Sequence, residues 1–311
     1  MLSACNFYMP IFEEALDAYG LPLELRYLPI IESALNPSAV SRAGASGLWQ
    51  FMIGTGKIYG LESNSLVDER RDPIKATWAA ARYLKEMYDI YGDWNLVIAA
   101  YNCGPGTINK AIRRANGETD YWKIYNYLPK ETRGYVPAFI AANYVMTYYC
   151  DHNICPMETN IPASTDTVQV NKNLHFEQIA DLCNVPLDQI KSLNPQYKKQ
   201  MIPGDSKPYT LRLPIDAIST FIDKQDTIYT HRADELFRNR KTVAVKDITP
   251  ATRKTTSAVA GKGNLTYYTI KSGDTLSTIA RKYGVTIKDI QRWNGMSSTK
   301  IAAGKRLKIY K

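Results

Sequence analysis

The sequence predicts an α+β protein, with a mainly helical N-terminal half followed by small modules in which short strands flank two helices. Three observations support this prediction. Apolar residues recur at helical spacing over residues 74–88 and 136–149. Strand patterning is scarce before residue 150. From about residue 165 the pattern changes, and residues 168–204 and 268–304 match at a constant offset. Each copy predicts a strand, a helix, a turn, a second helix and a closing strand.

Helix boundaries in the N-terminal half are marked by local signals. Asp72-Pro73 predicts a helix start, with Asp as the cap and Pro at the first helical position. Gly20-Leu-Pro22 predicts the end of one helix and the beginning of the next. Between them, Ser41-Arg-Ala-Gly-Ala-Ser-Gly47 is a loop of small residues, where backbone can approach a ligand closely. This half is therefore expected to be a helical domain with one exposed, glycine-containing loop.

The two repeat copies agree at their apolar, Asn and Gly positions but differ at one turn. Asn173 and His175 of the first copy replace Gly273 and Thr275 of the second, so the turn that they occupy is altered in the first copy. Residues 244–263 are polar and rich in Thr, Ala and Lys, which predicts a linker. The expected domains are residues 1–155, 166–215 as a degenerate module, 216–263 as a partly helical segment with linker, and 264–311.

The net charge of +9 is concentrated at the C-terminus. Residues 265–311 hold ten Lys and Arg against two Asp, a net charge of +8. Such a segment suits an anionic partner, which leaves nucleic acid, a membrane surface and an acidic wall polymer as candidates. Hydrophobic residues make up 45% of the chain, yet no apolar run approaches the roughly 18 residues that a membrane span needs.

The five cysteines leave the redox state open. Cys150 and Cys155 flank a short polar turn, and they form either a local disulfide or two thiols. The same turn holds Asp151 and His152, but no second Cys/His pair stands at ligand spacing, so a metal site is not expected. No cofactor is expected either.

Glu32 is the first candidate for chemistry. It stands among Ile30, Ile31 and Leu35 near the end of a predicted helix. Burial there disfavours the charged carboxylate and raises its pKa. A carboxyl that stays protonated near neutral pH can donate its proton to a glycosidic oxygen. Since most helical Glu residues simply face water, this observation alone is weak.

Four segments in order change that balance: Ile31-Glu-Ser33, Ser41–Met52 with its Gly-Leu-Trp-Gln, Ala99-Ala-Tyr-Asn-Cys-Gly-Pro-Gly106, and Leu128–Pro137 with Glu131 and Tyr135. In these segments the chain resembles the lytic transglycosylases of the SLT family, and its Trp49 suggests their membrane-bound lytic murein transglycosylase D branch. The C-terminal copy, from Tyr268 to Gly304, resembles a LysM domain, which binds glycans that contain N-acetylglucosamine. Because the corresponding turn is altered in the first copy, that copy is expected to be structural or to bind a different glycan.

The resemblance implies a lysozyme-like catalytic domain that acts on peptidoglycan. The family cleaves the bond between N-acetylmuramic acid and N-acetylglucosamine without water. One carboxyl, here Glu32, protonates the leaving oxygen and then deprotonates the muramoyl 6-hydroxyl, which closes a 1,6-anhydro ring. Retaining glycosidases instead need a second carboxylate at about 5–5.5 Å as nucleophile. In the family, the residue that matches Glu131 helps to shape the site.

The remaining roles are expectations with simpler alternatives. Ser33 and Ser46 hydrogen-bond the substrate or orient Glu32, unless they only cap turns. Gln50 contacts an acetamido or hydroxyl group, unless it is a structural amide. Tyr101 and Tyr135 position Glu32 and the sugar, and Asn102 builds the loop that holds Tyr101. Trp49, Phe51 and Met52 are expected to pack and to form a subsite wall, and Trp49 stays open as a subsite residue because sugar rings stack on aromatic faces. In the LysM domain, the residues expected at the glycan are Gly273, Asp274, Thr275 and Asn294.

Other function classes stay open at this stage. A hydrolytic muramidase resembling goose-type lysozyme shares part of the motif set. A non-catalytic peptidoglycan-binding protein is disfavoured because the site residues occur together. A nucleic-acid partner is set aside because the wall glycan explains the basic modules better. The expected location is the bacterial envelope, in the periplasm, with association with the outer membrane left open. Leu2-Ser-Ala-Cys5 has the letters of a lipoprotein cleavage site, but only Met1 precedes it. Membrane association is therefore expected through a segment outside this chain.

Overall fold

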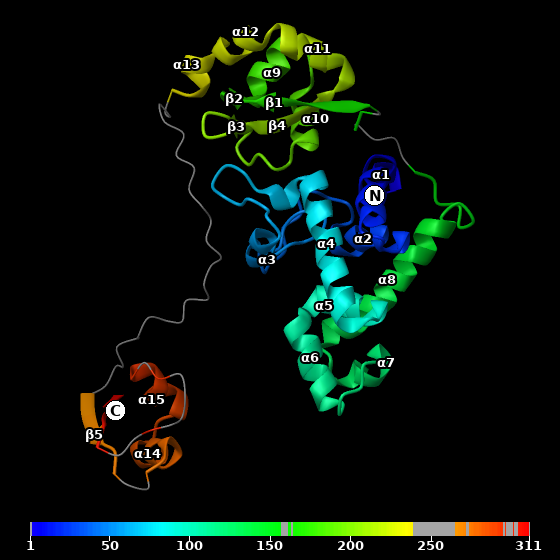
Figure 1. Cartoon of the computed structure of the whole chain (residues 1–311). Coiled ribbons are helices and arrows are strands. Elements are labelled where there is room, and N and C mark those ends of the chain that lie inside the picture. The colour runs from blue at the N-terminus through cyan, green and yellow to red at the C-terminus, as the bar shows by residue number, and fades with distance from the viewer. Residues whose placement is uncertain are drawn as a thin grey trace. The chain divides into compact units, whose positions relative to one another are not determined.

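The computed structural model describes residues 2–156, 161–162, 164–238, 265–271, 274–294, 296, 301 and 304–310. The chain forms two compact units, Met1–Pro250 and Ala251–Lys311. The first unit contains a helical domain and a small module of helices and strands, and the second contains another such module (Figure 1). The α+β prediction is thus confirmed. The expected linker, residues 244–263, lies outside the described residues, as does Gly273.

The helical domain is built around α4 and α5, which pack against α1 and α8 (Figure 1). Its core includes large aromatic side chains, such as Phe12 and Trp49, among aliphatic ones. Its helices are α1 (Leu2–Ala18), α2 (Leu28–Ser33), α3 (Ile53–Ile58), α4 (Pro73–Tyr91), α5 (Trp94–Cys103), α6 (Pro105–Arg114), α7 (Tyr121–Ile124) and α8 (Lys130–Tyr148), with 3-10 turns at Leu23–Tyr27, Glu69–Arg71 and Tyr125–Tyr127.

Helix α4 shows why these residues form these elements. The Asp72 carboxylate accepts hydrogen bonds from the N–H groups of Ile74 and Lys75, so it caps the helix as predicted. Gly92, with φ of 63°, ends the helix in the left-handed conformation that glycine adopts readily. The buried face carries small side chains, which allow the neighbouring helices to approach closely. These are Ala76, Ala79, Ala80 and Ala81.

The first module (residues 164–230) consists of two short antiparallel sheets and their helices. Strand β1 (Thr165–Val170) pairs with β4 (Tyr209–Pro214), with Thr165 opposite Pro214 and Val170 opposite Tyr209. A second pair joins β2 (Asn173–His175) to β3 (Met201–Pro203). Between them lie α9 (Phe176–Cys183) and α10 (Leu187–Leu193). The predicted order of strand, helix, helix and strand is present, with one additional strand pair.

The core of the first module continues beyond residue 215. Ala217, Phe221 and Ile228 belong to the same buried cluster as the strands and helices of the repeat. The boundary expected at 215 therefore divides a single core, because the amphipathic pattern that follows belongs to helices packed on the module. These helices are α11 (Ile215–Asp223) and α12 (Gln225–Thr230), followed by α13 (Ala233–Leu236).

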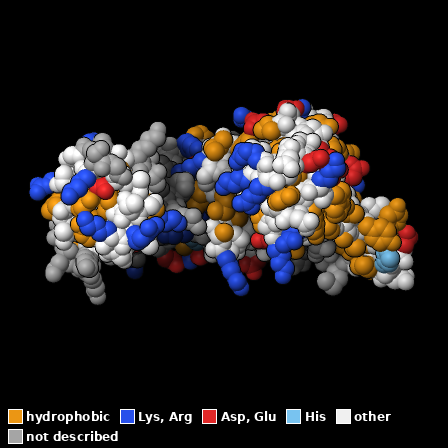
Figure 2. Space-filling model, turned by 90° about the horizontal axis from the view of Figure 1, so that it is seen from below, with side chains coloured by type: hydrophobic (Ala, Val, Ile, Leu, Met, Phe, Trp, Pro, Cys, Tyr) orange, Lys and Arg blue, Asp and Glu red, His pale blue; other side chains and the backbone are white. Residues whose placement is uncertain are grey.

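The second module (residues 265–310) repeats the plan. Strand β5 (Leu265–Thr269) pairs antiparallel with β6 (Arg306–Tyr310), and α14 (Leu276–Tyr283) and α15 (Ile287–Trp293) lie between them in sequence. It has a core of its own, which includes Ile279 and Ile290. Figure 2 shows Lys and Arg side chains, with few Asp or Glu, on the visible face of this unit. Its basic character is therefore present at the surface.

One asparagine braces each module in the same way. The Asn194 side chain donates to the carbonyls of Ile190 and Arg212 and accepts from the Arg212 N–H. Asn294 makes the corresponding bonds to Ile290 and Lys308. Both side chains thus join the end of the second helix to the closing strand. The matched Asn positions in the repeat have a structural cause.

Among the described residues, none of the helices has the length and apolarity that a membrane span requires.

Candidate active site

Glu32 stands at the end of a very short helix. Helix α2 begins with Pro29 in its first turn and ends after Ser33. Ala34 and Leu35 then adopt left-handed backbone conformations, with φ of 51° and 60°. Such conformations are uncommon for residues other than glycine, and they are held by bonds from the N–H groups of these residues to α2 carbonyls. The chain therefore turns sharply just after Glu32, which stays partly exposed.

Burial sets the proton affinity of Glu32. Burial of the carboxyl raises its pKa to about 7, a hydrogen bond from Tyr135 opposes the shift, and the negative charge of Glu131 adds to it. The Tyr135 hydroxyl, on α8, donates this bond to Oε1 of Glu32. Since Oε1 accepts from Tyr135, Oε2 is left to carry the acid proton. The neutral acid inferred from the sequence is thus supported by its surroundings.

Tyr101 reaches the same site from α5. Its hydroxyl donates to the Trp49 carbonyl at 2.7 Å. Burial and then the charge of Glu32 raise the pKa of Tyr101 well above its ordinary value, so the phenol stays neutral. The bond that Tyr101 makes holds the loop of residues 39–51, which we call the 39–51 loop.

The 39–51 loop is fastened from several sides. The Ser33 hydroxyl lies 2.9 Å from the Leu48 carbonyl, and the Trp49 indole N–H donates to the Thr77 hydroxyl at 2.9 Å. Trp49 is 1% exposed, which confirms that it packs. Within the loop, Gln50 has a φ of 47°, and its side chain donates to the Gly47 carbonyl at 2.8 Å. The loop is thus a rigid structure placed next to the residue that follows Glu32.

Ser46 is enclosed by the protein in this loop. Its side chain has 0% exposure, and its hydroxyl accepts a bond from Arg71 Nε at 3.1 Å. The backbone of Ser46 bridges Val40 and Phe51. A hydroxyl enclosed in this way holds the loop together and does not face a ligand. Ser33 likewise bonds to carbonyls of the protein, at Leu48 and Pro29.

Helices α5 and α8 are joined next to the site by Asn102. The Thr132 hydroxyl donates to Asn102 Oδ1 at 2.9 Å, and Thr132 is buried. Glu131, one residue earlier, is exposed. The structure therefore brings Glu32, Tyr101 and Tyr135 together, with Asn102 holding two of the supporting helices and Glu131 acting on Glu32 through its charge.

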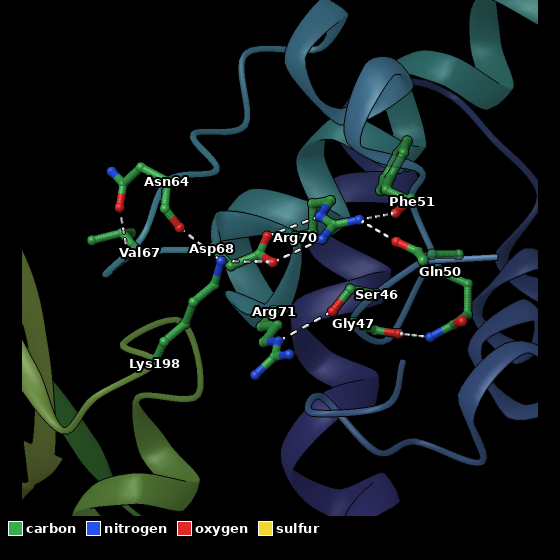
Figure 3. Close-up of polar contacts among 12 residues, drawn as sticks. Ser46, Gly47, Gln50, Phe51, Asn64, Val67, Asp68, Arg70, Arg71 and Lys198 are labelled. Carbon is green, nitrogen blue, oxygen red and sulfur yellow. Dashed lines mark hydrogen bonds and ion pairs between the residues drawn. The ribbon is translucent and has the colours of Figure 1, made fainter. Parts of the chain in front are cut away.

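Sequence reasoning missed Asp68 and Arg70. Both are almost fully buried, at 1% and 5% exposure, and Arg70 bonds to carbonyls of the 39–51 loop (Figure 3). They lie in the charged run Asp68–Asp72, and such runs usually mark a solvated surface. No spacing in the sequence distinguishes a buried arginine from an exposed one.

In the second module, the described candidate residues have structural partners. Asp274 Oδ2 accepts from the Tyr268 hydroxyl and from the Lys271 N–H, each at 2.8 Å. Thr275 caps α14. The Asn294 amide bonds to Ile290 and Lys308, so it braces the module. His175 caps α9 of the first module as Thr275 caps α14, which explains why the exchange is tolerated.

The Cys150 turn was considered above for a disulfide and for a metal site. Cys150 and Cys155 are not joined by a disulfide. Within the described residues, no group of three or more His, Cys, Asp or Glu side chains is arranged to hold a metal ion.

Three known family models match separate parts of the chain, beginning with the helical domain. Residues 9–124 fit the model of the transglycosylase SLT domain. The helical domain is therefore similar to an SLT domain. Residues 164–230 fit the LysM-like domain of the lytic transglycosylase MltD, and residues 268–309 fit the LysM domain. The resemblances drawn from the motifs are thereby confirmed, and the first module, the weaker of the two repeats, has a family model of its own.

Individual proteins to which the chain is similar are named as lytic murein transglycosylases. The chain is 33% identical over 294 residues to the membrane-bound lytic murein transglycosylase D of Escherichia coli, a match that covers 93% of this chain and 60% of that protein. Over 124 residues, covering 38% of this chain and 19% of the relative, it is 33% identical to the soluble lytic murein transglycosylase of the same organism. The crystal structure of the 70 kDa soluble lytic transglycosylase from Escherichia coli matches with a TM-score of 0.40 at 29% identity, covering 46% of this chain and 24% of that chain.

Proposed function

We propose that the chain is a peptidoglycan lytic transglycosylase that cleaves the β-1,4 bond between N-acetylmuramic acid and N-acetylglucosamine and leaves 1,6-anhydro ends. The observation that carries the proposal is Glu32, whose pKa is raised to about 7 by burial while Tyr135 binds one of its oxygens. The SLT match and the relatives named as lytic murein transglycosylases support it.

The reaction follows from one carboxyl acting twice. The Oε2 proton of neutral Glu32 passes to the glycosidic oxygen, the bond from that oxygen to C1 of the muramoyl residue breaks, and N-acetylglucosamine leaves. The muramoyl 6-hydroxyl then bonds to C1 and gives its proton to the Glu32 carboxylate, which restores the acid. No water is consumed. An acid whose pKa lies near the working pH suits both steps.

The other residues of the site support these steps. Tyr135 orients the Glu32 carboxyl, and Tyr101 holds the 39–51 loop through Trp49. We propose that Gln50, which is partly exposed, contacts the sugar. Ser33 and Ser46 fix the loop, Asn102 fixes α5 to α8, and exposed Glu131 shapes the site through its charge.

The modules extend the proposal to the whole chain. The SLT domain is assigned to residues 1–155 and the LysM domain to 264–311, with the first module between them. The +8 charge of residues 265–311 and the LysM match support attachment to an anionic, glycan-rich wall. Such a substrate places the protein in the bacterial envelope, and association with a membrane, as in the name of one relative, belongs to the same proposal.

Mass spectrometry of the muropeptides released from purified peptidoglycan tests the reaction. We expect products one water lighter than those of a muramidase, and we expect the Glu32→Gln variant to release none while it keeps its fold and still sediments with the wall. Reducing ends would make the protein a hydrolytic muramidase. Absence of any product from the wild-type chain would leave a binding protein.

A further inference from the structure

Arg70 clamps the 39–51 loop at its middle and at its C-terminal end. Its Nη1 donates to the carbonyls of Gly44 and Phe51, each at 2.8 Å. Ser46 and Gln50 lie between these two carbonyls in the sequence. Because one guanidinium nitrogen bonds to both carbonyls, Arg70 ties these two backbone segments together.

Asp68 holds the clamp in place. Its two carboxylate oxygens accept from Arg70 Nε at 2.9 Å and from Arg70 Nη2 at 2.8 Å. Burial acts to raise the pKa of Asp68, but the hydrogen bonds and charge of Arg70 outweigh it and hold the pKa below its usual range. A two-point pair of this kind fixes the orientation of the guanidinium plane as well as its place.

The first module reaches the same carboxylate. The Lys198 ammonium lies 3.7 Å from Asp68 Oδ2 and donates to the Asn64 carbonyl at 2.7 Å. The backbones also pair, because the Asp68 N–H donates to the Gln196 carbonyl and the Lys198 N–H to the Leu66 carbonyl, each at 2.8 Å. Leu66 and Val67, from the SLT domain, are buried in the core of the first module.

We propose that the first module is a positioning part of the catalytic domain: by docking on residues 64–68 it sets Asp68 through Lys198, and Asp68 sets the Arg70 clamp that holds the 39–51 loop. Lys198, Asp68 and Arg70 are positioning residues, since each acts through another group. The first module thus has a task in the reaction that is separate from glycan binding.

The physical reason lies in the charges of the junction. Asp68 and Arg70 are almost withdrawn from water, and the side chain of Lys198 is only 20% exposed. Interactions among poorly hydrated charges are strong, so removal of one cation is felt by the remaining pair. Lys207 offers a matched control, because it bonds to Glu62 at 2.6 Å in the same junction while its side chain is 53% exposed.

Hydrogen exchange on the folded chain of 311 residues tests the proposal without reference to activity. The amides of Ser41, Ser46 and Gly47 bond within the 39–51 loop and report its closure. We expect Lys198→Met to speed exchange of this loop by about 2- to 30-fold, the range of coupling energies through packed networks. Lys207→Met should leave the rate at the wild-type value, and Lys198→Arg should restore it.

Two results would overturn the proposal. One is exchange of the 39–51 loop in Lys198→Met at the wild-type rate. The other is a hydrogen-exchange rate that rises in α5 of Lys198→Met by the same factor as in the 39–51 loop, which would show general loosening of the domain.

Kinetics give a second readout that rests on the proposed function. The Lys198→Met variant should raise KM for soluble glycan strands more than it lowers kcat, because Gln50 is displaced while Glu32 and Tyr135 stay in place. A fall in kcat with unchanged KM would contradict this route. If the wild-type chain releases no muropeptide, the proposed function fails, and the exchange experiment still decides whether the module positions the loop.

Discussion

At the scale of single residues, the site depends on one carboxyl whose neighbours act in opposite directions. Burial and the charge of Glu131 favour the neutral form of Glu32, and the Tyr135 hydroxyl favours the ionised form. The proposed reaction needs the neutral form to donate and the ionised form to accept. A pKa of about 7 keeps both forms accessible near neutral pH.

Replacing Tyr135 by Phe tests this balance. Removal of a bond that favours the carboxylate should raise the pKa of Glu32 above about 7. Glu32 is lost as a proton donor when the pH rises through its pKa, so the alkaline limb of the pH–rate profile should move to higher pH in the Tyr135→Phe variant. The rate of muropeptide release measured across pH 5 to 9 would show it.

Tyr127 provides the control for this prediction, because its ring is 45% exposed. The Tyr127→Phe variant should keep the wild-type profile. An alkaline limb that stayed in place or moved to lower pH in Tyr135→Phe would mean that the hydroxyl does not act on Glu32.

At the scale of elements, the 39–51 loop depends on a glycine. Gly47 has a φ of 89°, and a Cβ placed there would stand 1.7 Å from the Arg70 carbonyl oxygen. Gly44 has nearly the same backbone conformation, with a φ of 88°, but a Cβ there would meet no heavy atom within 4 Å. Substitution of Gly44 therefore tests the cost of the backbone conformation alone, and substitution of Gly47 tests that cost together with a steric clash.

We expect Gly44→Ala to lower the free energy of unfolding by about 1 kcal/mol, and Gly47→Ala by more than about 3 kcal/mol, because the backbone of Arg70 cannot move aside cheaply. Urea denaturation of the two variants and the wild type measures both values. Equal losses would show that the contact between Gly47 and Arg70 relaxes without cost.

Most of the helices and their boundaries were predictable from the sequence, because the signals that mark them are local. The cap at Asp72, the break at Gly20 and the helices on either side follow from turn and capping chemistry within a few residues. Glu32, Tyr101 and Tyr135 were found because their motifs occur in order. The role of Ser46 was not found from the motifs, because its hydroxyl is held by Arg71, which is distant in sequence. The shared core of the first module and the helices after residue 215 could not be predicted, because an amphipathic helix does not reveal which core it covers.

At the scale of the whole molecule, the chain combines two units with separate cores, each of which has buried side chains of its own. Deletion of residues 264–311 should therefore leave the fold of the first unit intact while it removes a net charge of +8. We expect the shortened chain to sediment less with peptidoglycan sacculi and to cleave soluble glycan strands at the wild-type rate.

Salt gives an independent check on this deletion. If the basic segment attaches the chain to an anionic wall, the difference between the full and shortened chains should shrink as ionic strength rises. Unchanged co-sedimentation after the deletion would place wall binding in the first unit.

The paired asparagine braces, Asn194 and Asn294, bear on how the two modules can diverge. Each brace fastens a helix end to a closing strand by bonds to backbone, which are indifferent to the side chains of the neighbouring turn. The turn that differs between the two copies still caps the first helix of each module, through His175 in one and Thr275 in the other. A duplicated domain of this design can change its ligand, or lose ligand binding and take a positioning role, by a few substitutions that leave its architecture unaltered.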